Sequence, residues 1–255
     1  MNPIKNIPTV IVLACLALTA CQPAPAPTAE PAVIEPPTAE VIQPETPTLI
    51  PAAAISTDPP LPTHTPLPPP AMVLIYQDDF SDPNSGWEQY REPVDGILDY
   101  EDSAYRMLVQ PPQNTFWVNA NQVYDNVILE VDAARREGPE ENVYGLMCRL
   151  DSSYNAYMFV ISSTGNYGIA IWEDHNFELL GSGVMESSIA IKTGTESNRI
   201  RATCVDSLLS LSVNGEEILA ISDDRIQSGD VGLVTGTRGA PGVDILFDNF
   251  TIYQP

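Results

Sequence analysis

The chain from Val73 to Pro255 consists of short apolar or alternating runs, each ended within a few residues by turn-forming residues. No run sustains the 3.6-residue period of an amphipathic helix, whereas short apolar and alternating runs are typical of β-strands. About a dozen strands in one domain predict two packed sheets, and therefore an all-β fold. The clearest strands are predicted at Arg106–Val109, Asn126–Asp132, Val143–Arg149, Ala156–Ile161 and Tyr167–Trp172.

The turn residues agree with a β fold. Asn214-Gly215 separates the apolar runs Leu208–Val213 and Glu217–Ile221. Both central residues of a type I′ turn need positive φ, which Asn and Gly adopt readily, so this segment is predicted to be a β-hairpin. Asp95-Gly96 and Thr164–Asn166 mark further turns of the same kind.

A family resemblance accompanies the strand pattern. In chain order its motifs are Asp79–Trp87, Asp95–Ile97, Tyr144–Leu146 with Cys148-Arg149, Val213–Gly215, Gly229–Leu233 and Phe247–Phe250. This order resembles exported concanavalin-A-like jelly-roll modules, among them laminin-G-like and 3-keto-disaccharide hydrolase-like domains, and it covers Asp78 to Tyr253. The resemblance implies a two-sheet antiparallel jelly-roll sandwich. It implies no single activity, because that fold hosts lectins, glycosidases, sensors and scaffolds.

Residues 1–20 are built like a bacterial lipoprotein signal peptide. One cation, Lys5, precedes the uncharged run Thr9–Leu18, which is too short to span a bilayer. Residues 18–21 (LTAC) resemble a lipobox, whose Cys thiol receives diacylglycerol and becomes the first residue of the mature protein. We expect Cys21 to carry diacylglycerol and palmitate and to hold the domain on the outer face of the cell membrane, or of an outer membrane where the host has one. The alternative is an ordinary secretory signal cleaved near Ala20.

Residues 21–72 are predicted to be a disordered stalk. Of the 25 prolines, 16 lie between Gln22 and Met72, and none of the 15 glycines does. Proline fixes φ and removes a donor, so this segment is expected to fluctuate around polyproline II and to reach at most on the order of 150 Å. A docking tract for a proline-binding partner is the alternative. The globular domain is then predicted at residues 73–255.

Cys148 and Cys204 both lie in strand-like runs of an exported protein, 56 positions apart. A disulfide is the expected state in that compartment. The required Cα separation, near about 5.5 Å, predicts that the two strands are neighbours in one sheet. The alternative is a pair of buried, reduced thiols.

The charge balance bears on the choice of partner. Residues 73–255 carry ten Lys or Arg against 29 Asp or Glu. Such an excess of acids repels phosphate backbones and anionic lipid, so we expect no nucleic-acid partner and no membrane contact except through the N-terminal lipid. The simplest reading of the acids is a solvated surface that keeps the domain soluble.

Catalytic motifs are incomplete. Glycosidases of the concanavalin-A-like fold that resemble the laminarinase group carry Glu-x-Asp-x-Glu on one strand face, and here Glu130 and Asp132 are followed by Ala134. One member of the catalytic pair is therefore missing. The domain has one histidine, His175, and lacks a Gly-x-Ser-x-Gly elbow. The sequence favours a protein that is not an enzyme.

Calcium is the one cofactor that the sequence suggests. Alternation along the last strand places Asp248 on the inward face with Phe250 and Ile252. If the first and last strands pair, Asp78 or Asp79 would lie nearby and supply further oxygen ligands for a structural Ca²⁺. The competing explanation is that Asp248 accepts backbone N–H groups at a strand edge.

Saccharide binding is the most specific function that the residues predict. Sugars are recognised by flat aromatic faces with polar neighbours. The candidates are Trp117, Trp172 and Tyr154, with Asn119, Glu173 and Asn155 beside them. We therefore expect a monomeric, non-catalytic binding or sensory module for a glycan or an envelope or extracellular protein. A glycoside-processing enzyme and a purely structural envelope lipoprotein are the alternatives.

Overall fold

The computed structural model describes residues 72–255. The predicted signal peptide, Cys21 and the Pro-rich segment as far as residue 71 lie outside these residues. Within residues 72–255 there is no helix with the length and apolarity needed to cross a membrane.

Sixteen strands make up the described part of the chain. They are β1 (Val73–Asp78), β2 (Tyr90–Glu92), β3 (Gly96–Glu101), β4 (Ala104–Val109), β5 (Thr115–Tyr124), β6 (Val127–Glu137), β7 (Asn142–Leu150), β8 (Ala156–Ile161), β9 (Asn166–Glu173), β10 (Asn176–Leu179), β11 (Glu186–Ser187), β12 (Asn198–Val205), β13 (Leu208–Val213), β14 (Glu216–Ser222), β15 (Gly229–Thr237) and β16 (Val243–Gln254). The predicted hairpin at Asn214-Gly215 is confirmed, because both residues have positive φ and join β13 to β14.

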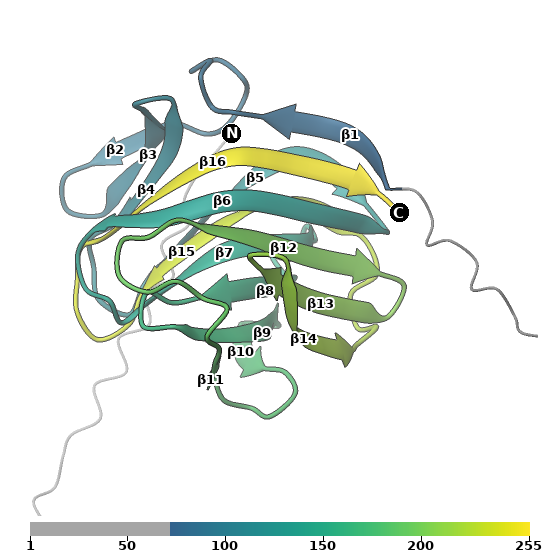
Figure 1. The fold of residues 1–255 in the computed structure, drawn as a ribbon. Helices are drawn as coiled ribbons and strands as arrows, with labels where there is room; N and C mark the ends of the chain where they lie inside the picture. Colours follow the sequence, from purple (N-terminus) through teal and green to yellow (C-terminus); the bar gives the residue numbers. More distant parts are fainter. Residues whose placement is uncertain (1–71) are drawn as a thin grey trace, which may run out of the picture. The chain divides into compact units, whose positions relative to one another are not determined.

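The strands form two antiparallel sheets. A nine-stranded sheet has the order β14-β13-β12-β6-β16-β4-β3-β2, with β1 paired to β16, and a seven-stranded sheet has the order β10-β9-β8-β7-β15-β5, with β11 paired to β9. Figure 1 shows the sheets as two layers, with β6, β12 and β16 in one and β7, β8 and β15 in the other. The predicted jelly-roll sandwich is therefore confirmed.

The core lies between the two sheets and is filled by alternate side chains of the strands that face it. Trp87, Phe159, Phe247 and Phe250 belong to this core, and all four are at most 5% exposed. The rings of Trp87 and Phe250 meet edge to face, with their centroids 5.1 Å apart. Such aromatic pairs add to the stabilisation that burial alone supplies.

The disulfide between Cys148 and Cys204 is present, but its predicted position was wrong. Cys148 lies on β7 in the seven-stranded sheet and Cys204 lies on β12 in the nine-stranded sheet. The bond therefore crosses the core and joins the two layers instead of linking neighbouring strands. The Cα atoms are 6.9 Å apart, at the long end of the usual range.

The predicted inward orientation of Asp248 was also wrong. Asn249 has φ of 52°, and the pairing of β16 with β6 shifts between Asp248 and Thr251. This β-bulge inserts a residue between Phe247 and Phe250, so both phenylalanines point into the core. Asp248 consequently lies on the outer face and is only partly buried.

Candidate functional site

The outer face of the seven-stranded sheet is a continuous surface formed by five adjacent strands. Its central row is set by the register of β5, β15, β7, β8 and β9, and runs through Trp117, Val234, Gly145, Val160 and Gly168. The neighbours of these residues along each strand belong to the core, so the row itself points away from it. The core neighbours are Val118, Leu233, Leu146, Phe159 and Ile169.

The middle of this face consists of glycines and buried apolar side chains. A Cβ atom on Gly145 would overlap the carbonyl oxygen of Phe159, and one on Gly232 would overlap that of Val118. Side chains are therefore excluded at both positions by the closeness of the neighbouring strands. Val234 and Met147 point outward as well, yet they are at most 1% exposed. We call the middle of this face, formed by Gly145, Met147, Val160, Gly232 and Val234, the apolar floor; its residues are almost fully covered.

Aromatic rings stand at both sides of the floor. The ring of Tyr154, in the turn between β7 and β8, lies against that of Trp117 on β5, with centroids 6.4 Å apart. On the opposite side, Trp172 on β9 is paired directly with Phe177 on β10. Tyr154 is 50% exposed and Phe177 is 56% exposed, whereas the two tryptophans are half-buried. Sequence reasoning named three of these four residues and missed Phe177.

The three polar candidates have structural partners. Asn119 donates to Asp230 over 2.6 Å. Asn155 donates to Asp151 over 2.9 Å and accepts the backbone N–H of Asp174, so it fixes two turns. Glu173 faces Arg225, 3.4 Å away, instead of the floor. All three polar candidates are therefore engaged with neighbouring polar groups of the fold.

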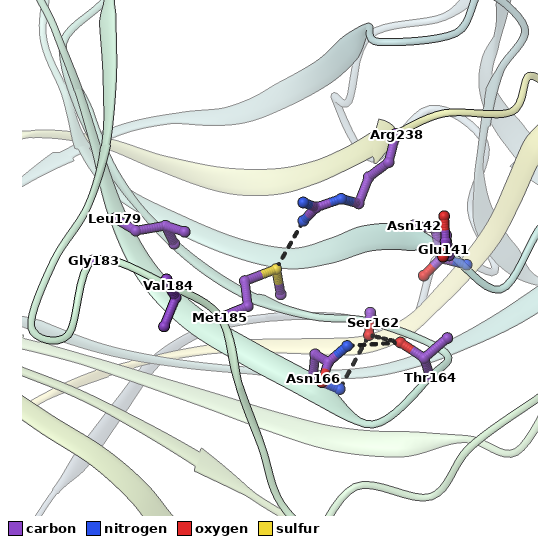
Figure 2. A pocket seen from close by; sticks show the side chains of 10 residues that line it. All are labelled: Glu141, Asn142, Ser162, Thr164, Asn166, Leu179, Gly183, Val184, Met185 and Arg238. Atoms are coloured by element: carbon purple, nitrogen blue, oxygen red, sulfur yellow. Dashed lines mark hydrogen bonds between the residues drawn. The ribbon is translucent and has the colours of Figure 1, made fainter. Parts of the chain in front are cut away.

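A cavity of about 630 Å³ occupies the other end of the same face. Leu179 and Met185 flank it on one side, directly over Gly168 of the central row. Figure 2 shows Arg238 reaching across the cavity toward Met185. The residues lining it are Glu141, Asn142, Ser162, Thr164, Asn166, Leu179, Gly183, Val184, Met185 and Arg238. They come from strand ends and turns; the sequence marked Thr164–Asn166 as a turn, but none of these residues as part of a binding site.

The polar groups of the cavity are arranged by short-range hydrogen bonds. Ser162 Oγ and Thr164 Oγ1 are 2.7 Å apart, and Asn166 Nδ2 donates to Thr164 Oγ1 over 3.0 Å. Asn142 is tied to the backbone of its surroundings and to Ser163. Hydroxyl, amide, carboxylate and guanidinium groups thus border one water-accessible hollow beside the apolar floor.

The calcium candidates lie near the junction of β1 and β16. These strands pair as predicted, with Asp78 opposite Phe250. The carboxylate of Asp78 accepts N–H groups of Phe80 and Trp87, and that of Asp79 accepts the backbone N–H and the side-chain hydroxyl of Ser81. Asp248 accepts its neighbour's N–H, and burial, followed by the charges of nearby acids, raises its pKa. No group of three or more His, Cys, Asp or Glu side chains suited to a metal occurs in residues 72–255. Calcium binding stays a prediction.

The acids of the incomplete glycosidase motif lie on the other side of the sandwich. Glu130 is on β6 of the nine-stranded sheet, where it is 8% exposed and paired with Arg199 and Arg201. Burial by itself would raise the pKa of Glu130, but the hydrogen bonds from these arginines hold that pKa below its ordinary value. His175 is exposed in the tight turn between β9 and β10.

The fold is similar to those of known carbohydrate-active and related proteins. The carbohydrate-binding module CBM66 from Bacillus subtilis aligns with a TM-score of 0.54 and 13% identity over 66% of this chain and 96% of that chain. A Bacillus subtilis protein of unknown function with a galectin-like fold aligns with a TM-score of 0.54 and 13% identity, over 71% of this chain and 96% of that chain. An endo-β-galactosidase from Clostridium perfringens that releases GlcNAcα1-4Gal aligns with a TM-score of 0.54 and 10% identity, over 75% of this chain and 65% of that chain.

These likenesses establish the fold. The chain shares a galectin-like, concanavalin-A-like jelly-roll sandwich with carbohydrate-binding modules and glycoside hydrolases. No protein-family model matches the sequence, and neither does any curated protein. A shared fold does not determine an activity, which has to be inferred from the site.

Proposed function

We propose that this protein is a membrane-anchored, extracytoplasmic module that binds a glycan without cleaving it. The observation that carries the proposal is the two partly exposed aromatic pairs, Trp117 with Tyr154 and Trp172 with Phe177, which border the apolar floor of the seven-stranded sheet. Sugar rings present flat C–H surfaces that stack on aromatic faces, and their hydroxyls need polar groups close by. The cavity at the end of the floor supplies such polar groups.

The shape of the surface favours an extended saccharide over a monosaccharide. Five strands at about 4.8 Å spacing separate β5 from β9 by roughly 19 Å, so the two aromatic pairs stand several sugar residues apart. A chain lying across the floor can contact both pairs and end in the cavity. A single sugar can contact only one of them.

The distribution of carboxylates supports a non-catalytic role. Glycoside hydrolysis uses two carboxylic acids on opposite sides of the scissile bond, one of them with a raised pKa. Among the ten residues that line the cavity, Glu141 is the one acid. Glu130 and Asp132 lie on the opposite sheet, where the arginines keep the pKa of Glu130 low. Neither arrangement provides an acid–base pair at the floor.

The anchoring part of the proposal rests on the N-terminal sequence. A lipid on Cys21 and a proline-rich segment up to residue 72 would display the domain at a distance from the bilayer. The acid excess of residues 73–255 would keep the domain off anionic lipid and away from nucleic acid. A tethered domain that captures glycans at the cell surface fits these features.

A glycan array tests the proposed function. The wild-type protein is expected to bind a defined set of oligosaccharides, and Trp117→Ala or Trp172→Ala is expected to weaken that binding by roughly fivefold or more, because stacking contributes about 1 kcal/mol or more per ring. Tyr253→Ala is the control, since Tyr253 is a half-buried aromatic residue on the outer face of the nine-stranded sheet. Thermal melts of each variant verify folding.

Two results would overturn the proposal. An array on which the folded wild-type protein binds no glycan would remove the binding function. Release of reducing ends from any array glycan during incubation would remove the non-catalytic part and favour a glycoside-processing enzyme.

A further inference from the structure

The cations of residues 72–255 are almost all engaged. Seven of the ten Lys and Arg residues form ion pairs with Asp or Glu. The guanidinium of Arg149 is bonded to three backbone carbonyls, and Lys192 reaches the carbonyl of Ser197 over 3.4 Å. Arg238 is the exception. In a domain with 29 acids for ten cations, a guanidinium whose side-chain partners within residues 72–255 include neither a carboxylate nor a carbonyl is unusual.

Arg238 lies in the cavity at the end of the apolar floor. Its Nη1 is 3.1 Å from the Sδ of Met185, and no other side-chain hydrogen bond of Arg238 occurs within the described part of the chain. A thioether sulfur is a weak acceptor, so most of the five guanidinium donors have no strong acceptor within residues 72–255. The side chain is exposed and extends across the hollow, as Figure 2 shows.

We infer that the cavity takes an acidic sugar, whose carboxylate is bound by the guanidinium of Arg238. This inference rests on the proposed glycan-binding function and names the saccharide class. A guanidinium and a carboxylate match in a planar, two-point hydrogen-bonded pair, which gives direction as well as attraction. A hexuronic acid carries such a carboxylate on a ring that the neighbouring floor can accept.

The other groups of the cavity fit the rest of such a sugar. Thr164 and Asn166 offer hydroxyl and amide groups to ring hydroxyls, on a side of the hollow separate from Arg238 in Figure 2. Glu141 is the acid of the cavity and forms no ion pair with Arg238 within residues 72–255. Its carboxylate can accept sugar hydroxyls while repelling a second carboxylate, so the acid group of the sugar is directed to Arg238.

The charge of the whole domain sharpens this selectivity. An excess of acids over the surface repels every anionic ligand at long range. A preference for acidic over neutral glycans would therefore have to come from a local contact, and Arg238 is the cation placed to make it. Removing its charge should abolish the preference outright instead of reducing it slightly.

The test compares uronate-containing glycans with their carboxyl-reduced counterparts on one array, using the wild-type protein, Arg238→Gln and Arg238→Lys. We expect the wild type to bind the uronates roughly tenfold more tightly than the reduced partners, because a charge-assisted hydrogen bond contributes more than about 1.4 kcal/mol. Arg238→Gln should bind both members of each pair equally. Arg238→Lys should keep part of the preference, since it keeps the charge and loses the two-point geometry.

Equal binding of both members by the wild type, or a preference that survives in Arg238→Gln, would overturn the acidic-sugar inference while leaving glycan binding intact. Absence of binding to both members of every pair, and to all neutral glycans, would overturn the proposed function together with the inference. Because Arg238 is exposed, its replacement should not change the melting temperature, and a melt of each variant checks this.

Discussion

Cys148 on β7 and Cys204 on β12 connect the two sheets of the sandwich through its core, with their Cα atoms 6.9 Å apart. Both cysteines are fully buried among core side chains. The crosslink closes a loop of 56 residues, which includes β8 to β11. The disulfide thereby links the sheet that carries the apolar floor to the nine-stranded sheet.

Removing this crosslink should lower the stability of the fold. For the double variant Cys148→Ser with Cys204→Ser, we expect a loss of about 3–4 kcal/mol in the free energy of unfolding, because a loop of this length is no longer constrained in the unfolded chain. Urea unfolding of the variant and of the wild type measures the difference. The wild type in excess reductant should approach the variant. A midpoint unaffected by both changes would contradict this account.

Arg149 should be the most sensitive cation of the domain. Its guanidinium is 1% exposed and donates to the carbonyls of Asp125, Ile226 and Asp206, which belong to three separate connecting segments. Arg149→Met leaves these carbonyls without their donors and should cost about 3 kcal/mol or more. Arg91→Met is the control, because Arg91 is an exposed ion-pairing residue whose loss should cost under about 1 kcal/mol. If the two variants lost the same free energy of unfolding in urea, the buried hydrogen bonds of Arg149 would be shown to be unimportant.

The apolar floor depends on glycine at position 232. A methyl group there would overlap the carbonyl oxygen of Val118 on the adjacent strand, so Gly232→Ala should force β5 and β15 apart and cost about 2–3 kcal/mol. A Cβ on Gly239 meets nothing within 4 Å, so Gly239→Ala should change stability by less than about 0.5 kcal/mol. Thermal melts of the two variants make the comparison. Similar melting temperatures would refute the close approach.

Glu101 makes stability depend on pH. Hydrogen bonds from Arg136 and then from Arg106 lower its pKa from 4.5 to about 2. A carboxylate whose pKa is lowered by folding stabilises the fold above its ordinary pKa and loses that contribution as pH falls toward the folded value. Glu101→Gln should therefore cost about 1 kcal/mol at neutral pH. The difference from the wild type should shrink from pH 4.5 toward pH 2, whereas a constant difference would exclude this linkage.

The layered architecture could be predicted from local pattern. The predicted strand Ala156–Ile161 coincides with β8, and Asn214-Gly215 forms the expected turn, because alternation and turn chemistry are encoded by neighbouring residues. The sheet that each cysteine occupies is not local information, so the disulfide was placed within one sheet instead of across two. The predicted inward orientation of Asp248 was wrong for a local reason. The positive φ of Asn249 creates a β-bulge, and simple alternation of side chains does not predict a bulge.

In the candidate site, too, some residues could be predicted from their neighbours in the sequence and others could not. Trp117 and Tyr154 were candidates because aromatic residues stood beside polar ones, and the structure brings their rings together. Phe177 and Arg238 were missed because their significance arises only when β10 pairs with β9 and when the end of β15 meets the cavity. Pairings between distant segments determine both contacts, and no spacing in the sequence expresses them.

The most direct test of the glycan-binding surface is a map of backbone amide chemical-shift changes as the strongest array ligand is titrated into the protein. The proposed function predicts that the largest changes fall in β5, β7, β9 and β15, around Trp117, Gly145 and Trp172. Changes concentrated in β6, β12 and β16 of the opposite sheet would contradict it.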